Sequence, residues 1–486
     1  MSTAIAKKTK SWYIHSALVN AWTFLFGLLP APAPITPLGM QVLGIFVGML
    51  WGWVFVDMVW PSILGLMALG LTSYTTVLDS FAAGIGHRIT LQVIVALLFG
   101  AYLSQYKLDE TMAFWFVSRK IAVGHPWIFA LLVFVGAYVV GALISGFPAI
   151  ILIWGIFYKF CDAMGIERKS SYAAYVLIGV AHIGMLGGLA LPFKESAIFY
   201  KGIIEPATGV ALGYMKWIIF WNISYFVYIL VYLLVGKLII RPDVSAFQRD
   251  NDFYAQYRHI RFAKEQYIPL SILIIFIVLL SLPSFMPAEW LITQQLNNLG
   301  IVGVGLGCIV ALSIMCNQSG HPLADFGQLF HKGINWSLVW LIAASLPVAA
   351  AMESGDTGIL SYTTLKLMPL VQNLSPGVFI IAVTLVFAAI TQVAHNMILM
   401  IVFIPMFCNL CAVNGTNPTV FALVFAMGIS SALITPGGSA NAALFHGNTE
   451  WITPKQAYTY STWVVIFSVL ATFIVGIPLA AWLYPM

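Results

Sequence analysis

The sequence predicts an all-α polytopic membrane protein with about 11 transmembrane helices and two re-entrant helical hairpins. Of its 486 residues, 61% are hydrophobic and 8% are charged, whereas soluble domains carry about 25% charged residues. Apolar runs long enough to cross a bilayer recur along the whole chain. Polar breaks rich in glycine and proline interrupt two of these runs, which predicts helices that are broken inside the membrane.

The predicted helices follow the apolar runs in order. Several runs have the length of a membrane-spanning helix, and others are too short to cross alone. They lie near residues 13–30, 38–56, 59–73, 89–105, 127–143, 150–165, 171–186, 208–240, 267–284, 299–316, 334–352, 376–393, 397–414, 418–434 and 457–484. The runs that begin near Trp127 and Phe379 meet polar breaks at Ser145 and His395, which predicts a hairpin or split helix at each.

Basic residues predict the orientation of the chain. Lys7, Lys8 and Lys10 precede the first span, and the longest polar stretch, 241–266, is also rich in arginine and lysine. Basic segments stay in the cytoplasm, so we expect an integral protein of the plasma (inner) membrane with a cytoplasmic N-terminus. The net charge of +5 forms no basic patch, so we expect no nucleic-acid partner. The five cysteines lie in or near apolar runs and are interpreted as packing residues.

Two spacings predict an internal duplication. Ser145 and His395 are 250 positions apart, and so are Gly187 and Gly437. Each half also has a charged turn ahead of its break, at 107–110 and 353–356. We therefore expect an N-terminal segment with the first span (1–36), a first repeat (37–240), a cytoplasmic linker (241–266) and a second repeat (267–486). Five spans per repeat, an odd number, would invert the repeats relative to each other and place the C-terminus outside.

The breaks are also the predicted binding site. A half-helix that starts inside the bilayer presents unpaired N–H groups and the positive end of its dipole, both of which favour an anion. Glycine lets backbone approach a ligand closely, although the same glycines can instead serve tight helix packing. In the first half the candidate residues are Ser145, Gly146, Phe147, Pro148, Gly187, Gly188, Lys194, Glu195 and Ser196. In the second half they are His395, Asn396, Met397, Thr435, Gly437, Gly438, Ser439 and Asn441.

Four stretches resemble the divalent anion/sodium symporter (DASS) family. Residues 35–51, 333–355, 395–405 and 435–441 are similar to the family's second helix, its DW…LxxSG stretch, its second Ser-Asn-Thr tip and its TPPN link. The resemblance covers nearly the whole chain. It implies inverted repeats, scaffold and transport domains, a homodimer, and elevator-type transport of dicarboxylates, citrate or sulfate, often with sodium.

The chain departs from that family at the tips. In the family, two Ser-Asn-Thr tips contact substrate carboxylates and sodium ions. Here the tips read SGF at 145–147 and HNM at 395–397, so that only Ser145 and Asn396 match. The first TPPN link is replaced by LPFKES at 191–196. By this resemblance, sodium would be held near Ser145, Gly188, Asn396 and Gly438.

Lys194 and Glu195 are the least expected residues of the chain. A charge without a partner inside a bilayer costs at least about 2.5–3.5 kcal/mol. A neutralised structural pair and a loop that reaches the membrane surface are two ordinary interpretations. The functional interpretation is that the Lys194 ammonium replaces a sodium ion as a fixed charge, and that His395 does similar duty in the other half. This predicts a proton-coupled carrier or an anion exchanger.

We expect secondary active transport of a small anion, coupled to sodium, protons or anion exchange. Di- or tricarboxylates are favoured because Phe147 and Met397 make the tips more apolar. Cation/proton antiport, transport of another inorganic ion such as sulfate, and a channel are the alternatives. The chain has none of the hydrolase or nucleotide-binding motifs, so we expect no enzyme and no cofactor beyond Na⁺ or H⁺. The expected partners are a small anionic substrate, the lipid bilayer and a second copy of the chain.

Overall fold

A computed structural model describes residues 8–144, 146–248, 262–317, 320–394 and 396–485 of the chain. Two candidate site residues, Ser145 and His395, therefore lie outside the described residues. Within these ranges the chain is helical, with one isolated β-bridge between Cys316 and Pro322. The α-helices are α1 (Lys10–Leu25), α2 (Pro37–Phe55), α3 (Trp60–Gly70), α4 (Val77–Ile85), α5 (Arg88–Gln105), α6 (Leu108–Val117), α7 (Pro126–Leu143), α8 (Gly146–Met164), α9 (Ser171–Leu186), α10 (Glu195–Thr208), α11 (Tyr214–Val235), α13 (Tyr267–Ser281), α14 (Leu291–Ile314), α15 (Phe326–Gly333), α16 (Trp336–Glu353), α17 (Ile359–Val371), α18 (Pro376–Ile390), α19 (Asn396–Asn414), α20 (Pro418–Ile429), α21 (Ala440–Gly447), α22 (Pro454–Ala471) and α23 (Ile477–Leu483).

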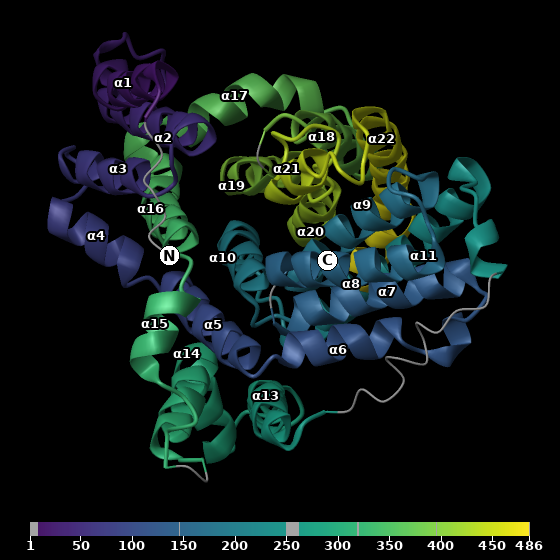
Figure 1. The fold of residues 1–486 in the computed structure, drawn as a ribbon. Coiled ribbons are helices and arrows are strands. Elements are labelled where there is room, and N and C mark those ends of the chain that lie inside the picture. The colour runs from purple at the N-terminus through teal and green to yellow at the C-terminus, as the bar shows by residue number, and fades with distance from the viewer. Residues whose placement is uncertain (1–7, 145, 249–261, 318–319, 395, 486) are drawn as a thin grey trace.

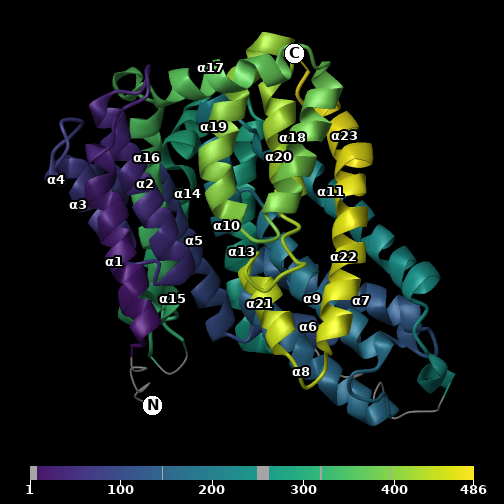
Figure 2. The same ribbon diagram turned by 90° about the horizontal axis from the view of Figure 1, so that it is seen from above.

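The helices form two groups that lie side by side (Figure 1). The first group contains α1 to α5 and α13 to α16, and the second contains α7 to α11 and α18 to α23. Two shorter helices, α6 after α5 and α17 after α16, lead the chain from the first group into the second. Figure 2 shows that α1 begins at one end of the bundle and α23 finishes at the other.

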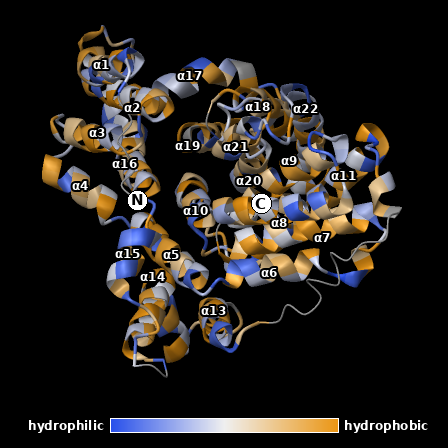
Figure 3. Ribbon diagram, in the orientation of Figure 1, coloured by the Kyte–Doolittle hydropathy of each residue, from blue (hydrophilic) through white to orange (hydrophobic). Residues whose placement is uncertain are grey.

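Ten helical segments of the described ranges are long and apolar enough to cross a membrane. Both limbs of the first hairpin, α7 and α8, are among them, whereas α1 has 16 residues and is shorter than any of the ten. Figure 3 shows apolar residues along most of the helices, while α15 is mainly hydrophilic. The chain is therefore a polytopic all-α membrane protein, as its composition predicts.

Proline starts several of the helices that surround the breaks. α7, α18, α20 and α22 all have proline at their first position, where the N–H that proline lacks would be unpaired in any case. A polar residue before the proline often caps the same helix. The Oδ1 atom of Asn417, for example, accepts hydrogen bonds from the N–H groups of Thr419 at 2.9 Å and Val420 at 3.2 Å.

The order of elements repeats, but only one of the two predicted spacings marks equivalent positions. α5 to α11 and α16 to α22 follow each other in the same order, and α8 and α19 both begin directly after a break, at Gly146 and Asn396. The glycine pairs do not correspond, because Gly187 directly follows α9 whereas Gly437 lies just before α21. The match of 250 positions therefore holds at the starts of α8 and α19, whereas the two glycines lie at different places within the corresponding loops, α9–α10 and α20–α21.

The predicted charged turn at 107–110 is also corrected. It is the first turn of α6, in which Asp109 is 8% exposed and accepts a hydrogen bond from Ser104 Oγ at 3.0 Å. Six short helices, α4, α6, α10, α15, α17 and α21, were absent from the predicted spans. They have 8 to 14 residues and carry polar side chains, so hydrophobicity alone does not reveal them.

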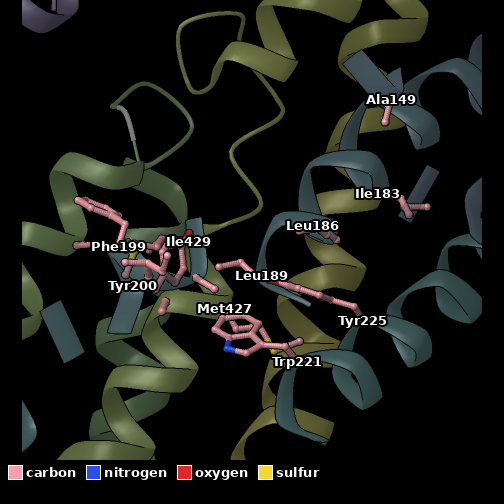
Figure 4. Close-up of a cluster of buried hydrophobic side chains, with 14 of the residues drawn as sticks. Ala149, Ile183, Leu186, Leu189, Phe199, Tyr200, Trp221, Tyr225, Met427 and Ile429 are labelled. Carbon is pink, nitrogen blue, oxygen red and sulfur yellow. The ribbon is translucent and has the colours of Figure 1, made fainter. Parts of the chain in front are cut away.

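The two halves of the chain meet in a buried apolar cluster (Figure 4). Tyr200 from α10 and Trp221 from α11 lie in it with Met427 from α20, and all three are buried. The hydroxyl of Tyr200 lies 3.0 Å from the Oγ atom of Ser430, at the end of α20. The cluster thus joins a first-half helix to the second half beside the loop that follows α9.

Candidate functional site

Lys194 joins the first break to the loop that follows α9. Its Nζ donates a hydrogen bond of 2.6 Å to the carbonyl oxygen of Ile144, the last described residue before the break. Nζ also lies 3.2 Å from the Oε2 atom of Glu195, and the two side chains are 5% and 13% exposed. A buried charge needs partners of this kind. The loop therefore lies inside the protein rather than at a surface, and Lys194 and Glu195 form a buried ion pair.

Close backbone contacts surround this pair. A Cβ atom at Gly100 of α5 would lie 2.9 Å from Ile144 O and 4.0 Å from Lys194 Nζ. A Cβ atom at Gly187 would lie 2.7 Å from the backbone nitrogen of Ala142, in the last turn of α7. Only glycine fits where two backbones approach so closely. Gly187 thus serves tight packing of the loop against the limb that leads to the break.

Gln392 joins the second break to the segment that follows α20, with an uncharged amide. Its Nε2 donates to Ala388 O at 2.7 Å and to Ser431 O at 3.0 Å. Its Oε1 accepts from the N–H groups of Leu433 and Ile434, both at 3.0 Å. The buried amide is therefore fully hydrogen-bonded and fixes an irregular segment whose backbone groups have no helical partners.

Two predicted residues of the second half pack around the same amide. The hydroxyl of Thr435 donates to the carbonyl oxygen of Gln392. A Cβ atom at Gly438 would lie 2.9 Å from that oxygen. Ser439 caps α21 by accepting from Ala442 N at 3.3 Å, and its hydroxyl donates to Ala432 O at 2.5 Å. These residues hold the segment in shape.

The remaining second-half candidates differ in exposure. The Oδ1 atom of Asn396 accepts from Met397 N at 2.9 Å, so it caps the start of α19. Asn441 is 7% exposed, whereas Gly437 is exposed. Asn396, Asn441 and Gly437 do not line the cavity that is described next, beside the first break.

A cavity of about 420 Å³ opens beside the first break, and we call it the tip cavity. From the second helix group, Ile144, Pro148 and Glu195 line it, and α5 and α15 form the opposite wall. Six of the ten residues of that wall are apolar or glycine, and the other four are Ser104, Gln105, Gln328 and Lys332. Phe147, next to Pro148, is 36% exposed. The Glu195 carboxylate of the buried pair therefore faces a wall of mixed apolar and polar residues.

The structure thus gathers the candidate residues into two sets. Gly146, Pro148, Gly187, Gly188, Lys194, Glu195 and Ser196 belong to the first, and Thr435, Gly438 and Ser439 surround Gln392 in the second. α10 packs against α5, α19 and α20 and so lies between the sets. The four hydrogen bonds of the Gln392 amide and the position of Lys332 in the wall of the tip cavity were not predicted, because both depend on contacts between segments far apart in sequence.

No three His, Cys, Asp or Glu side chains of the described ranges come close enough together to hold a metal ion. A sodium ion at the predicted positions would therefore rely on carbonyl, hydroxyl and amide oxygens.

Comparison with known proteins adds the family. The family described as "Sodium:sulfate symporter transmembrane region" matches residues 8–486. Among solved structures, the chain is similar to MtrF of Neisseria gonorrhoeae, which is described as illuminating a class of antimetabolite efflux pumps. The TM-score is 0.58 at 14% sequence identity, over 96% of this chain and 95% of that one, which shows a shared fold. Comparison with curated proteins finds no match.

The family match spans nearly the full chain and confirms the resemblance to the divalent anion/sodium symporters. This polytopic membrane protein belongs to the sodium:sulfate symporter family of transporters.

Proposed function

We propose that this chain is a secondary active transporter of small anions, with di- or tricarboxylates as its substrates. The observation that carries the proposal is the buried ammonium of Lys194, which is 2.6 Å from the carbonyl oxygen that ends the first limb. Family membership supports anion transport, and the apolar residues in the wall of the tip cavity support an organic anion over an inorganic one. The two helix groups support an elevator-type movement, and a homodimer remains part of the proposal.

Lys194 replaces a sodium ion at the first break in this proposal. A sodium ion there would use oxygens of the broken backbone, and the Ile144 carbonyl already accepts from Nζ. A sodium ion would have to share this oxygen with the ammonium, whose charge is already paired with the carboxylate of Glu195. The first break therefore does not suit sodium, and the site would carry its positive charge covalently.

Charge balance suggests how transport is coupled. Glu195 already neutralises Lys194, so an anion that binds Lys194 adds uncompensated negative charge to a buried site. A proton on Glu195 would compensate it, and exchange for a second anion would avoid the problem altogether. The carrier would thus be driven by protons or by counter-transported anion.

Sulfate transport is the second candidate, and the family description favours it. Sulfate needs hydrogen-bond donors rather than apolar wall residues, and the break offers backbone N–H groups at the start of α8. Cation/proton antiport is the remaining alternative, and it predicts flux that depends on a cation gradient and not on any anion.

The test is uptake of labelled succinate, citrate and sulfate into liposomes that hold the purified protein. Each anion is tested with an inward sodium gradient, an inward proton gradient, or unlabelled anion inside. We expect uptake without sodium, driven by protons or by internal anion. Accumulation that occurs only with a sodium gradient would contradict the role of Lys194.

Glu195→Gln separates the two forms of coupling. We expect this variant to lose proton-driven accumulation and to keep exchange, because the amide cannot take up the proton. Glu450→Gln is the matched control, since Glu450 is 61% exposed and pairs with Arg168 at a surface. Proton-driven accumulation that survives Glu195→Gln would place the coupling elsewhere.

A further inference from the structure

A second cavity lies along the same pair of helices as the tip cavity. It has a volume of about 260 Å³ and lies between the start of α5 and the middle of α10, and we call it the vestibule. The tip cavity uses α5 from Ala96 to Gln105, whereas the vestibule uses Arg88 to Gln92. On α10, Glu195 lines the tip cavity and residues 198–206 line the vestibule. The two cavities therefore lie at different levels along α5 and α10, with the Lys194–Glu195 pair at the level of the tip cavity.

The vestibule carries more positive than negative charge. Arg88, Lys201 and Glu205 line it. Lys201 Nζ is 3.4 Å from Glu205 Oε1, but that oxygen also accepts from Leu212 N at 2.9 Å. Arg88 makes neither a hydrogen bond nor an ion pair with any described residue. The guanidinium of Arg88, an exposed residue, thus remains available beside the Lys201–Glu205 pair, whose charges balance.

Gln92 is the second sign of a ligand. It is 8% exposed and lines the vestibule, and in the described part of the chain its amide has no hydrogen-bond partner. Its amide nitrogen and oxygen are not among the fully buried polar atoms that lack a partner, so the amide group reaches the cavity, where a ligand can bond to it. A ligand oxygen in the vestibule would accept from this amide while Arg88 and Lys201 balance its charge.

The vestibule lies near one end of the helix bundle. Lys216, two residues after Tyr214 of its wall, has its Nζ 4.9 Å from the ring centroid of Tyr484 near the end of the chain. The Tyr214 side of the vestibule therefore lies toward the end of the bundle where α23 finishes (Figure 2). The predicted orientation makes that end external.

We propose that the vestibule is a second anion-binding site, at which a small oxyanion is held by Arg88, Lys201 and Gln92 before it reaches Lys194. The ligand chemistry is a carboxylate or sulfate group. A lipid phosphate has the same chemistry, and the proposal commits to the soluble anion. Only the role of this site in transport rests on the proposed function. Binding of the anion is tested without transport and does not depend on it.

The binding test uses a reporter cysteine. Pro206→Cys is made in a Cys316→Ser background, since Pro206 is an exposed residue of the vestibule wall that is not one of the three proposed ligands, and Cys316 is the exposed cysteine among the five. The rate of modification by an anionic thiosulfonate is measured in nanodiscs of phosphatidylcholine, with and without sulfate or succinate. We expect either anion to protect the cysteine, and Lys201→Gln or Arg88→Gln to raise the half-protecting concentration about tenfold.

A control variant tests whether the loss of protection is specific to the vestibule. Lys366→Gln is the matched control. Lys201 Nζ lies 4.7 Å from the ring centroid of Tyr214, and Lys366 Nζ lies in a similar way 5.6 Å from that of Tyr362, but Lys366 does not line the vestibule. The control variant should leave protection unchanged. Absence of protection by sulfate and succinate would overturn the proposal. So would protection that appears only when phosphatidylglycerol is added, since the site would then hold lipid.

A transport measurement covers the case in which the reporter variant does not fold. Half-saturating anion concentrations are measured from each face, in right-side-out and everted vesicles, for Lys201→Gln. We expect about a tenfold rise from the vestibule's face and little change from the other. An equal change from both faces would overturn the proposal. If no anion is transported at all, protection of the reporter still decides this inference, so its failure and that of the proposed function are distinct.

Discussion

Replacing Lys194 by methionine tests the fixed charge most directly. Methionine fills most of the same volume and removes the ammonium. Glu195, 13% exposed, then loses its cation, and Ile144 O loses its donor. Breaking a buried ion pair from one side costs about 3–5 kcal/mol. Because Glu195 lines a cavity that water can enter, we expect the lower end of this range, about 3 kcal/mol of the free energy of unfolding.

The assay separates stability from transport. The free energy of unfolding is measured by titration with SDS, followed by the helical circular dichroism signal. The double variant Lys194→Met/Glu195→Gln leaves no unpaired charge, so it should recover about 2 kcal/mol of the loss. Arg168→Met breaks an exposed pair, 57% and 61% exposed, and should cost under about 1 kcal/mol.

Uptake decides the role of the charge. If the ammonium balances the anion, the double variant stays inactive although its stability returns. If Lys194 only neutralises Glu195, the double variant transports anions at a rate near that of the unaltered protein. The second result would refute the fixed-charge reasoning, and failure of Lys194→Met to lower stability would refute the buried pair itself.

Three further predictions follow from local geometry. Gly187→Ala should cost about 2 kcal/mol in the same titration, because its Cβ atom would overlap the α7 backbone, whereas Gly437→Ala meets only a hydroxyl at 3.9 Å and should be neutral. Gln392→Leu leaves the N–H groups of Leu433 and Ile434 without acceptors and should lower the free energy of unfolding by at least about 2 kcal/mol. Protection of the segment after α20 from hydrogen exchange should fall as well. Unchanged protection would show that Gln392 does not hold this segment in place. Burial, and then the neighbouring Arg88, lower the pKa of His87, which lines the vestibule. Protonation adds positive charge there, so sulfate protection should tighten as pH falls through that lowered pKa and stay flat above it, and His87→Asn should remove the dependence.

The sequence was sufficient to predict the long helices and the position of the breaks. Uninterrupted apolar runs are a strong signal, and the run from Phe379 and that from Trp127 both stop within a few residues of the predicted break. The span predicted from 299 coincides with a kink: α14 begins at Leu291, but Gly300 has a non-helical backbone, with φ 52° and ψ −159°, that interrupts it.

The site could be predicted only in part. Lys194 was identified because a charge among apolar residues is conspicuous, and its partner Glu195 is adjacent in sequence. Its second partner, Ile144 O, lies 50 positions away and is a backbone atom with no sequence signature. The vestibule had one overlooked signal, the spacing of Lys201 and Glu205 by four residues, which places both charges on one face of α10.

The packing of α10 limits which motions of the protein are possible. α10 starts at the first break's loop, yet it packs against α19, which starts at the second break. Its Tyr200 is also fastened to Ser430 and to the cluster in Figure 4. Any displacement that preserves these contacts must move the two breaks together. In the elevator-type movement proposed above, both breaks would then move as one body, and neither hairpin would loosen while the other holds still.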